Sequence, residues 1–545
     1  APAEARALPW LQRQLELEDP GLSLNEGSEQ AMPCANPVRR APVQFPVNLL
    51  IDDAAEGLEL YSGYINVTDR DYLFYLFAAA ELGAPEDAPV VIWSNGGPGC
   101  SSTEGFTTEH GPLVLYGIKE DGSVAPAKLS RNPYAWNREA HVVYVDQPRY
   151  VGFSCGTGPF VTSSVDAAAD MVQFIRGWRL QFPEHARRKF ILAGESYGGH
   201  YVPAWSDAVR KFNENATADE RIEVSGLIIG NGIVNQTIQG RSFPKFARQH
   251  GLLPEEQHIE SLSDWGAREI VKHTLGYEPN YYDYRLVDQG CCGCSSYNYT
   301  EWSAFMMQQE IAEALHACGD SGIKAFGGCA AGCIQLPSFD ENDQFGYSGA
   351  IEWALDNGIN VTFYYGMSDT ACDYLGGYDM VSALRWKGST GFVASGMREL
   401  SIGSFPMGGI QEHGGLTWIQ IEGAGHMVPI NNPPAAYYAL GTLLPKTRKE
   451  PGLSQGVNGI YGAGVSNLFD EQHAAGTAKG RQHAMYYLEG VACTTCVVSV
   501  ALLLGGAFAM RRSEQNRAIL YRQGTVLQVE AHIATVDAAL YGPCE

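Results

Sequence analysis

Short apolar runs separated by helical stretches constrain the fold of this 545-residue chain more than any other feature of its sequence. Runs rich in Val, Ile, Phe or Tyr predict strands at residues 89–94, 140–145, 189–193, 222–229 and 360–365, and an aromatic run at 62–80 predicts two paired strands. Helical stretches lie between several of these runs, for example at residues 165–181 and 347–357. Strands that alternate with helices favour a mostly parallel sheet covered on both faces. We therefore expect an α/β fold.

Changes in composition divide the chain into segments. With 45% apolar residues the chain can bury a large core, and we place its main domain at residues 41–446, after an irregular leader at 1–40. Residues 236–345 interrupt the rhythm of strands and helices with a polar, Cys-rich and Tyr-rich sequence, which we interpret as a cap insertion. Residues 447–489 are Gly-rich and predict a linker.

Residues 490–510 carry no charge and predict a single transmembrane helix. At about 1.5 Å per residue this stretch is long enough to cross a hydrocarbon core of about 30 Å. Arg511 and Arg512 follow it at once, so the positive-inside rule places the tail, residues 511–545, in the cytosol. A buried core helix is the alternative interpretation, and the flexible linker before this stretch argues against it. The helix and the tail could also bind partners in a membrane complex.

Cysteines and glycosylation motifs indicate an oxidising compartment. The chain has 13 cysteines, and N-x-[ST] motifs occur at Asn66, Asn215, Asn235, Asn298 and Asn360. A zinc cluster is the alternative for the cysteines between 291 and 333, although no pair of histidines stands near them at ligand spacing.

Residues 1–20 lack an apolar signal core, so a chain that starts at Ala1 is expected to have lost its signal peptide. We therefore expect a type I membrane protein of the secretory system with a lumenal catalytic domain. The net charge of −24 argues against binding to nucleic acid.

Residues 194–198, G-E-S-Y-G, fit the G-x-S-x-G nucleophile elbow and stand between a predicted strand and a predicted helix. Ser196 then needs a base and a carboxylate that orients the base, and in this fold they follow in the order Asp or Glu, then His. Asp369 ends a predicted strand, and His426 lies in a loop after a short apolar run. A lone Asp or His is more often a solvated or capping residue, and the chain has 13 histidines.

A glycine-rich loop follows the predicted strand at 89–94. Its sequence, W-S-N-G-G-P-G-C-S-S at residues 93–102, can direct backbone N–H groups at an oxyanion. A phosphate-binding loop is the alternative, but no Lys follows the glycines and Pro98 removes one donor.

Taken together, these motifs resemble those of the serine carboxypeptidases, which have the α/β-hydrolase fold. The matching motifs are W-x-N-G-G-P-G-C-S-S at 93–102, G-E-S-Y-G-G-H-Y-V-P at 194–203, G-x-x-D-x-x-C at 366–372 and G-x-G-H-M-V-P at 423–429, and the resemblance extends over residues 62–443. It implies a catalytic triad of Ser196, His426 and Asp369. It also implies an oxyanion hole formed by the backbone N–H groups of Gly97 and Tyr197.

The resemblance further implies how the substrate's C-terminus is recognised. The terminal carboxylate would be bound by Asn95, Glu109 and Glu195, with Trp93 alongside, and Met427 would line the S1′ pocket for the departing residue. Two neighbouring carboxyls do not easily both ionise, so one would keep a proton and donate a hydrogen bond to the substrate. We therefore expect hydrolysis through an acyl-enzyme with best activity at about pH 4–6. The sequence indicates no metal and no organic cofactor.

Four positions depart from the family pattern or its surroundings. Arg149 and Tyr150 stand where a small Gly-containing turn is usual, Cys155 replaces a Tyr, and Cys372 is a candidate free thiol beside the site. The tyrosine is expected to narrow or reshape the cleft. Two other functions stay open: an acyltransferase on the same fold, and an inactive structural subunit of a membrane complex. The carboxylate-binding residues argue against the acyltransferase.

Overall fold

The computed structural model describes Cys34 and residues 36–444, with gaps at 82–87, 119–123, 255–256, 289–296, 298, 318–333, 335, 337, 345 and 404. Most of the expected leader, the linker, the expected membrane helix at 490–510 and the tail lie outside the described residues. Within the ranges that are described, no helix is both long and apolar enough to cross a membrane. The cysteines at 291–333, interpreted from the sequence as disulfide-bonded or as a zinc cluster, also lie outside the described residues.

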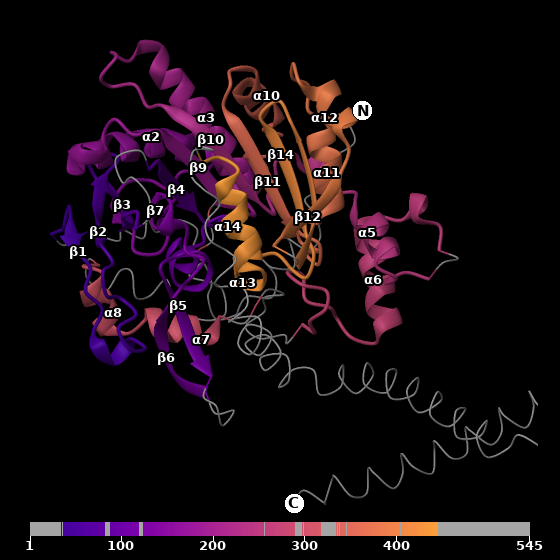
Figure 1. Cartoon of the computed structure of the whole chain (residues 1–545), viewed down its shortest axis with the longest axis horizontal. Coiled ribbons are helices and arrows are strands. Elements are labelled where there is room, and N and C mark those ends of the chain that lie inside the picture. The colour runs from indigo at the N-terminus through magenta and orange to yellow at the C-terminus, as the bar shows by residue number, and fades with distance from the viewer. Residues whose placement is uncertain are drawn as a thin grey trace, which may run out of the picture. The chain divides into compact units, whose positions relative to one another are not determined.

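A 12-stranded mixed sheet forms the centre of the described chain (Figure 1). Its main path runs β1-β2-β3-β7-β4-β9-β10-β11-β14-β13-β12. The central strands, from β7 to β14, pair in parallel, while the strands at both edges pair antiparallel. The bounds are β1 Ala41–Pro42, β2 Leu60–Asn66, β3 Asp71–Ala78, β4 Val90–Ser94, β7 His141–Asp146, β9 Phe190–Glu195, β10 Val224–Gly230, β11 Asn360–Gly366, β12 Arg398–Ile402, β13 Phe405–His413 and β14 Leu416–Ile421. The expectation of a mostly parallel sheet therefore holds for its central strands only.

Successive side chains of each strand enter two separate cores, because side chains of a strand point alternately to the two faces of a sheet. In β3, for example, Leu73 and Tyr75 belong to one core, and Phe74 and Leu76 belong to the other. Helices cover both faces. The first core packs against α2 Ser164–Gln181, α3 Gly198–Asn215, α10 Ser348–Asp356 and α11 Tyr374–Ala383, and the second against α7 Thr300–Met306, α8 Gln309–Ala314, α13 Val428–Asn431 and α14 Pro433–Gly441.

Helix α2 illustrates why its sequence forms a helix at this place. The side chain of Ser163 caps the helix by accepting a hydrogen bond from the backbone N–H of Asp166, whose own carboxylate suits the positive end of the helix dipole. Met171, Phe174 and Trp178 then recur at helical spacing and are buried against the sheet. Helix 165–181 was expected from this spacing and is confirmed.

All the strands expected from the sequence are present, and their ends lie within two residues of the predicted ends. Strands β12 to β14, and the separate hairpin of β5 Leu113–Ile118 and β6 Val124–Arg131, were not identified from the sequence. The described part of the expected insertion at 236–345 is helical. It contains α4 Gln236–Gln239, α5 Phe243–Gln249, α6 Asp264–Leu275, α7, α8 and α9 Phe339–Asn342.

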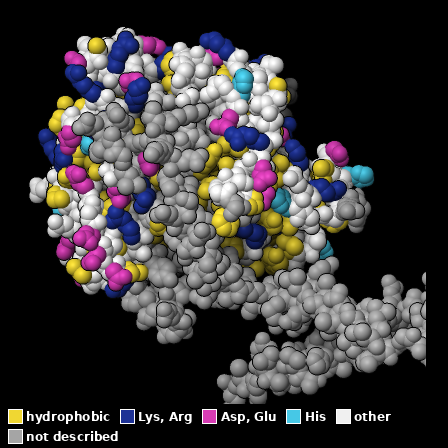
Figure 2. Space-filling view, viewed as in Figure 1, with side chains coloured by type: hydrophobic (Ala, Val, Ile, Leu, Met, Phe, Trp, Pro, Cys, Tyr) yellow, Lys and Arg dark blue, Asp and Glu magenta, His cyan; other side chains and the backbone are white. Residues whose placement is uncertain are grey.

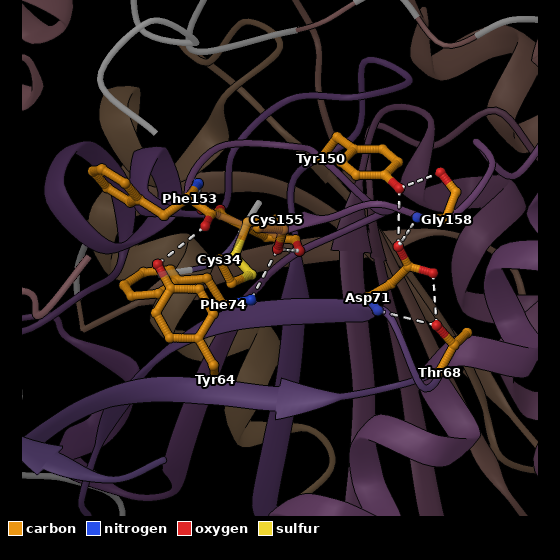
Figure 3. Close-up of a disulfide and its surroundings, with 11 residues drawn as sticks. Cys34, Tyr64, Thr68, Asp71, Phe74, Tyr150, Phe153, Cys155 and Gly158 are labelled. Carbon is orange, nitrogen blue, oxygen red and sulfur yellow. Dashed lines mark hydrogen bonds between the residues drawn. A yellow bond between two sulfur atoms is a disulfide. The ribbon is translucent and has the colours of Figure 1, made fainter. Parts of the chain in front are cut away.

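The departures at residues 149–155 have structural partners (Figure 3). Cys155, in the short strand β8 Cys155–Gly156, forms a disulfide with Cys34 and thereby ties the N-terminal segment to the sheet. The Tyr150 hydroxyl lies 2.9 Å from Oδ1 of Asp71, and its ring is buried. The Arg149 guanidinium forms ion pairs with Asp71 and with Asp170. None of these partners is a predicted site residue.

Removing the Cys34–Cys155 disulfide is expected to destabilise the protein. The bond closes a loop with a sequence separation of 121 residues, and native disulfides typically contribute about 2–4 kcal/mol to the free energy of unfolding, more for longer loops. Urea unfolding of Cys34→Ala and Cys155→Ala should show this loss. The double variant should lose little more than either single variant, and full additivity would contradict the account.

Candidate active site

Ser196 occupies a strained turn between β9 and α3. Its φ angle is +57°, in the left-handed region that non-glycine residues rarely adopt, and its backbone N–H donates to Gly230 O at 3.0 Å. Glycine is required where this turn packs against its neighbours. A Cβ at Gly199 would lie 2.4 Å from the carbonyl oxygen of Ile233. The turn thus has the shape expected of a nucleophile elbow.

Asp369 and His426, which follow β11 and β14, meet beside this turn. The His426 Nδ1 atom lies 2.7 Å from Asp369 Oδ2, and both side chains are buried. The backbone N–H of His426 donates to Tyr282 O at 2.7 Å, and the imidazole stacks on the Tyr282 ring with 4.1 Å between centroids. The second nitrogen, Nε2, has no hydrogen-bond partner in the described part of the chain. It is therefore available to a proton donor.

Asn231 holds the carboxylate of Asp369 in place. Its Nδ2 donates to Asp369 Oδ2 at 2.8 Å, and its Oδ1 accepts from the backbone N–H of Gly366 at 3.1 Å. The backbone N–H groups of Ala371 and Cys372 donate to the same carboxylate. The sequence analysis gave Asn231 no role. Because it contacts Asp369 and not the reacting atoms, it is a positioning residue.

The Cys372 thiol connects the elbow to the Asp–His pair. It is a buried free thiol, hydrogen-bonded to Ser196, and burial raises its pKa, so it stays neutral. Its sulfur, a carboxylate oxygen of Asp369 and a ring nitrogen of His426 all lie within 4.8 Å of one another. Ser196, Asp369 and His426 therefore converge, although the Ser196–His426 hydrogen bond is not formed in this structure.

The glycine-rich loop lies directly against the elbow. Gly96 is packed so closely that an added Cβ would lie 2.4 Å from the backbone nitrogen of Tyr197 and 2.9 Å from Ser196 Cβ. Gly97 adopts a φ angle of +109°. The two residues expected to form the oxyanion hole, Gly97 and Tyr197, are thus brought together beside Ser196.

The residues expected to bind a terminal carboxylate form one buried cluster. Asn95 Nδ2 donates to Glu109 Oε1 at 2.8 Å and to Glu195 Oε1 at 3.1 Å. Trp93 Nε1 donates to Asn95 Oδ1 at 2.8 Å, which fixes the orientation of the amide. All four side chains are at most 2% exposed. Oε2 of each glutamate has no hydrogen-bond partner among the described residues, so both can accept or share a proton with a further group.

Burial keeps this cluster protonated. Desolvation raises the pKa of Glu109 to about 7, against the opposing effect of the Asn95 hydrogen bond. Burial also raises the pKa of Glu195 well above its usual range, and the charges of Glu109 and Glu104 add to this effect. Below about pH 7 the glutamate pair therefore holds a proton that can be donated to an incoming carboxylate.

Comparison with known proteins agrees with this geometry. A family model described as serine carboxypeptidase matches residues 52–276 and 269–445. This chain belongs to the serine carboxypeptidase family. A serine carboxypeptidase-like protein of Oryza sativa subsp. japonica is 30% identical over 414 residues, which cover 70% of this chain and 92% of the relative. Carboxypeptidase Y of Candida albicans is 30% identical over 423 residues, which cover 70% of this chain and 72% of the relative.

A solved structure shows the same fold. A prohormone-processing carboxypeptidase from Saccharomyces cerevisiae aligns with a TM-score of 0.59 at 22% identity, covering 74% of this chain and 95% of the other. The α/β-hydrolase fold expected from the sequence is thus confirmed.

In this serine carboxypeptidase a small pocket of about 40 Å³ adjoins the elbow on the side of Cys372. Ile233, whose N–H donates to Ser196 O at 3.0 Å, lines the pocket together with Cys372. Asp264 and Arg268 of α6 lie in its wall, and burial raises the pKa of Asp264 to about 7. Sequence reasoning missed this pocket, because α6 reaches the elbow only through the folded insertion.

Sequence reasoning also missed Glu104 and Tyr299. Glu104 is buried beside the carboxylate cluster, where its charge raises the pKa of Glu195. The Tyr299 hydroxyl lies 2.7 Å from Sδ of Met427. Met427 is the residue expected to line the pocket for the departing residue. The only sequence signal for Glu104 is an acidic residue directly after the glycine-rich motif.

Replacing Asn231 should slow the chemical step and leave substrate binding intact. In Asn231→Ala the Asp369 carboxylate loses a hydrogen bond, and bonds to charged groups of this kind typically change rates by about 10- to 100-fold. Steady-state kinetics should show this loss in kcat with KM nearly unchanged, whereas Asn357→Ala, at an exposed asparagine, should behave as wild type. A rise in KM at constant kcat would contradict the positioning role.

Proposed function

We propose that this chain is a serine-type carboxypeptidase that releases C-terminal residues from peptides and proteins through an acyl-enzyme at acidic pH. The observation that carries the proposal is the buried cluster of Asn95, Glu109 and Glu195 next to the Ser196 elbow. A protonated pair of carboxyls can bind a free α-carboxylate, which only the last residue of a peptide offers. The cluster thus limits cleavage to the terminal bond.

In the acylation step Ser196 Oγ attacks the carbonyl carbon of the terminal peptide bond and its proton passes to His426 Nε2. The Asp369 carboxylate stabilises the imidazolium through the 2.7 Å contact at Nδ1. The backbone N–H groups of Gly97 and Tyr197 bind the oxyanion, and such donors each typically contribute about 2.7–4 kcal/mol. The C–N bond then breaks, the leaving amine takes the proton from His426, and the free amino acid departs.

Water completes the reaction in the reverse sense. His426 takes a proton from the water as its oxygen attacks the acyl carbon, and then returns a proton to Ser196 Oγ as the ester bond breaks. An acyltransferase would need no cluster for a terminal carboxylate, so the cluster favours hydrolysis of peptides.

The proposed setting is a lumenal catalytic domain of a single-pass type I membrane protein in the secretory system. The Cys34–Cys155 disulfide and the disulfide-bonded state of Cys100 support an oxidising compartment. Asn66, Asn215 and Asn360 are exposed and could carry glycans, whereas the Asn235 side chain caps α4. On the face shown in Figure 2, acidic and basic side chains are interspersed, in agreement with a protein that does not bind nucleic acid. The uncharged segment at 490–510 supplies the proposed anchor.

Replacing the nucleophile should abolish release of C-terminal residues. Ser196→Ala is expected to lower kcat on blocked dipeptides at pH 5 by at least about 10⁴-fold, because no acyl-enzyme can form. A serine-directed fluorophosphonate should label the wild type and not the variant. Labelling of a wild type that hydrolyses no peptide would instead favour the acyltransferase, and neither labelling nor hydrolysis would favour an inactive subunit.

Raising the pH should weaken binding of free carboxylates only. The pKa of Glu109 is raised to about 7, so the shared proton is present below this pH and is lost above it. KM for a peptide acid should therefore rise roughly tenfold per pH unit above pH 7. The same peptide with a C-terminal amide serves as the matched substrate, and its KM should not follow this trend. Parallel profiles for acid and amide would contradict the role of the glutamate pair.

A further inference from the structure

Glu104 is a buried carboxyl that the proposed reaction does not use. Its side chain is 1% exposed, and its Oε1 atom has no hydrogen-bond partner among the described residues. The ion pairs of the described residues include none formed by Glu104, Glu109 or Glu195. Buried carboxylates in proteins are normally paired with a cation or fully hydrogen-bonded. Oε1 of Glu104 therefore has no partner among the described residues, and a substrate could supply one.

Glu104 stands at the side of the site that receives the departing residue. The next residue, Gly105, donates its N–H to Asn95 Oδ1 at 3.1 Å, which places Glu104 beside the carboxylate cluster. The Tyr299 hydroxyl hydrogen-bonds to Glu104 and lies 2.7 Å from Met427 Sδ. Glu104, Tyr299 and Met427 therefore form one wall, which we call the Glu104 wall.

The described titratable groups that interact electrostatically with Glu104 are Glu109, Glu195, Tyr282 and Tyr299, and none of these four is a cation. Burial raises the pKa of Glu104 well above its usual range, and the Glu109 carboxyl raises it further. Burial likewise raises the pKa of Tyr299 and the pKa of Tyr282. The negative charge of Glu104 raises both pKa values further. His426, on which Tyr282 stacks, is the nearest basic group of the proposed reaction. A further cation would relieve the repulsion among the buried carboxyls.

We propose that Glu104 binds the cationic side chain of a C-terminal Lys or Arg, so that this enzyme prefers substrates with a basic last residue. The inference rests on the proposed carboxypeptidase function and adds its substrate class. The aliphatic stem of Lys or Arg would lie against Met427 and the Tyr299 ring, while the charged end reaches Oε1 of Glu104.

The test compares two blocked dipeptides that differ only in the last residue, Arg or Leu, at pH 6. Wild type should hydrolyse the Arg substrate with the higher kcat/KM. Glu104→Gln should lower kcat/KM for Arg by about 100-fold and leave the value for Leu within about threefold. Only a cationic side chain favours the ionised form of Glu104, so only the Arg substrate loses a charged partner in this variant. Glu104→Asp should recover part of the activity on Arg.

Glu301→Gln is the control, since it removes an exposed carboxylate from α7, the helix that follows Tyr299, and should change the hydrolysis of neither substrate. Retained activity of Glu104→Gln on Leu, with normal fluorophosphonate labelling of Ser196, shows that this variant folds. Equal losses on Arg and Leu would assign Glu104 to the carboxylate cluster and overturn the inference. An unchanged ratio of Arg to Leu would also overturn it. If wild type hydrolyses neither substrate, the proposed function itself fails, and this inference fails with it.

Discussion

Two hydrogen bonds from the Asn95 side chain, to Glu109 and to Glu195, are the interaction on which the account of this enzyme depends. They hold two buried carboxyls together, and of such a pair only one can ionise easily. Burying the Glu109 and Glu195 carboxyls costs free energy, and a substrate carboxylate that completes their hydrogen bonds would offset this cost. Glu195 directly precedes Ser196, so the group that recognises the C-terminus and the nucleophile belong to one turn. The distance between the group that binds the terminal carboxylate and the nucleophile is therefore fixed by this turn.

The sheet makes this arrangement possible. Strands β4, β9, β10, β11 and β14 run in parallel, so their carboxyl ends meet at one edge and deliver Asn95, Ser196, Asn231, Asp369 and His426 to the same place. Asn231 joins two of these strand ends by bonding to Asp369 and to Gly366. The antiparallel strands at both edges widen the sheet without contributing a triad residue. The helical insertion between β10 and β11 then supplies Tyr282, Tyr299 and the wall of the Cys372 pocket.

Local sequence patterns were enough to predict the central strands, α2 and the turn that carries Ser196. They were not enough to choose Asp369 and His426 among the other acidic residues and the 13 histidines, and those two came from the family resemblance. The carboxylate cluster could be predicted through the family resemblance, which maps Asn95, Glu109 and Glu195 residue by residue. Glu104 could not, since its role depends on Tyr299, which is 195 residues away in the chain and is brought near only by folding. The partner of Cys155 was equally hidden, because spacing alone does not determine disulfide pairing. Tyr150 turns its hydroxyl toward Asp71, a contact that no local pattern indicates.

Proton uptake on binding tests the central claim most directly. Calorimetric titration of the Ser196→Ala variant with a peptide acid ending in Leu, in buffers of different ionisation enthalpy, measures the protons taken up per peptide bound. If Glu109 and Glu195 share a proton with the substrate carboxylate, uptake should be near zero at pH 5.5 and approach one proton at pH 8.5, above the raised pKa of Glu109. Binding without proton uptake at pH 8.5 would contradict the account.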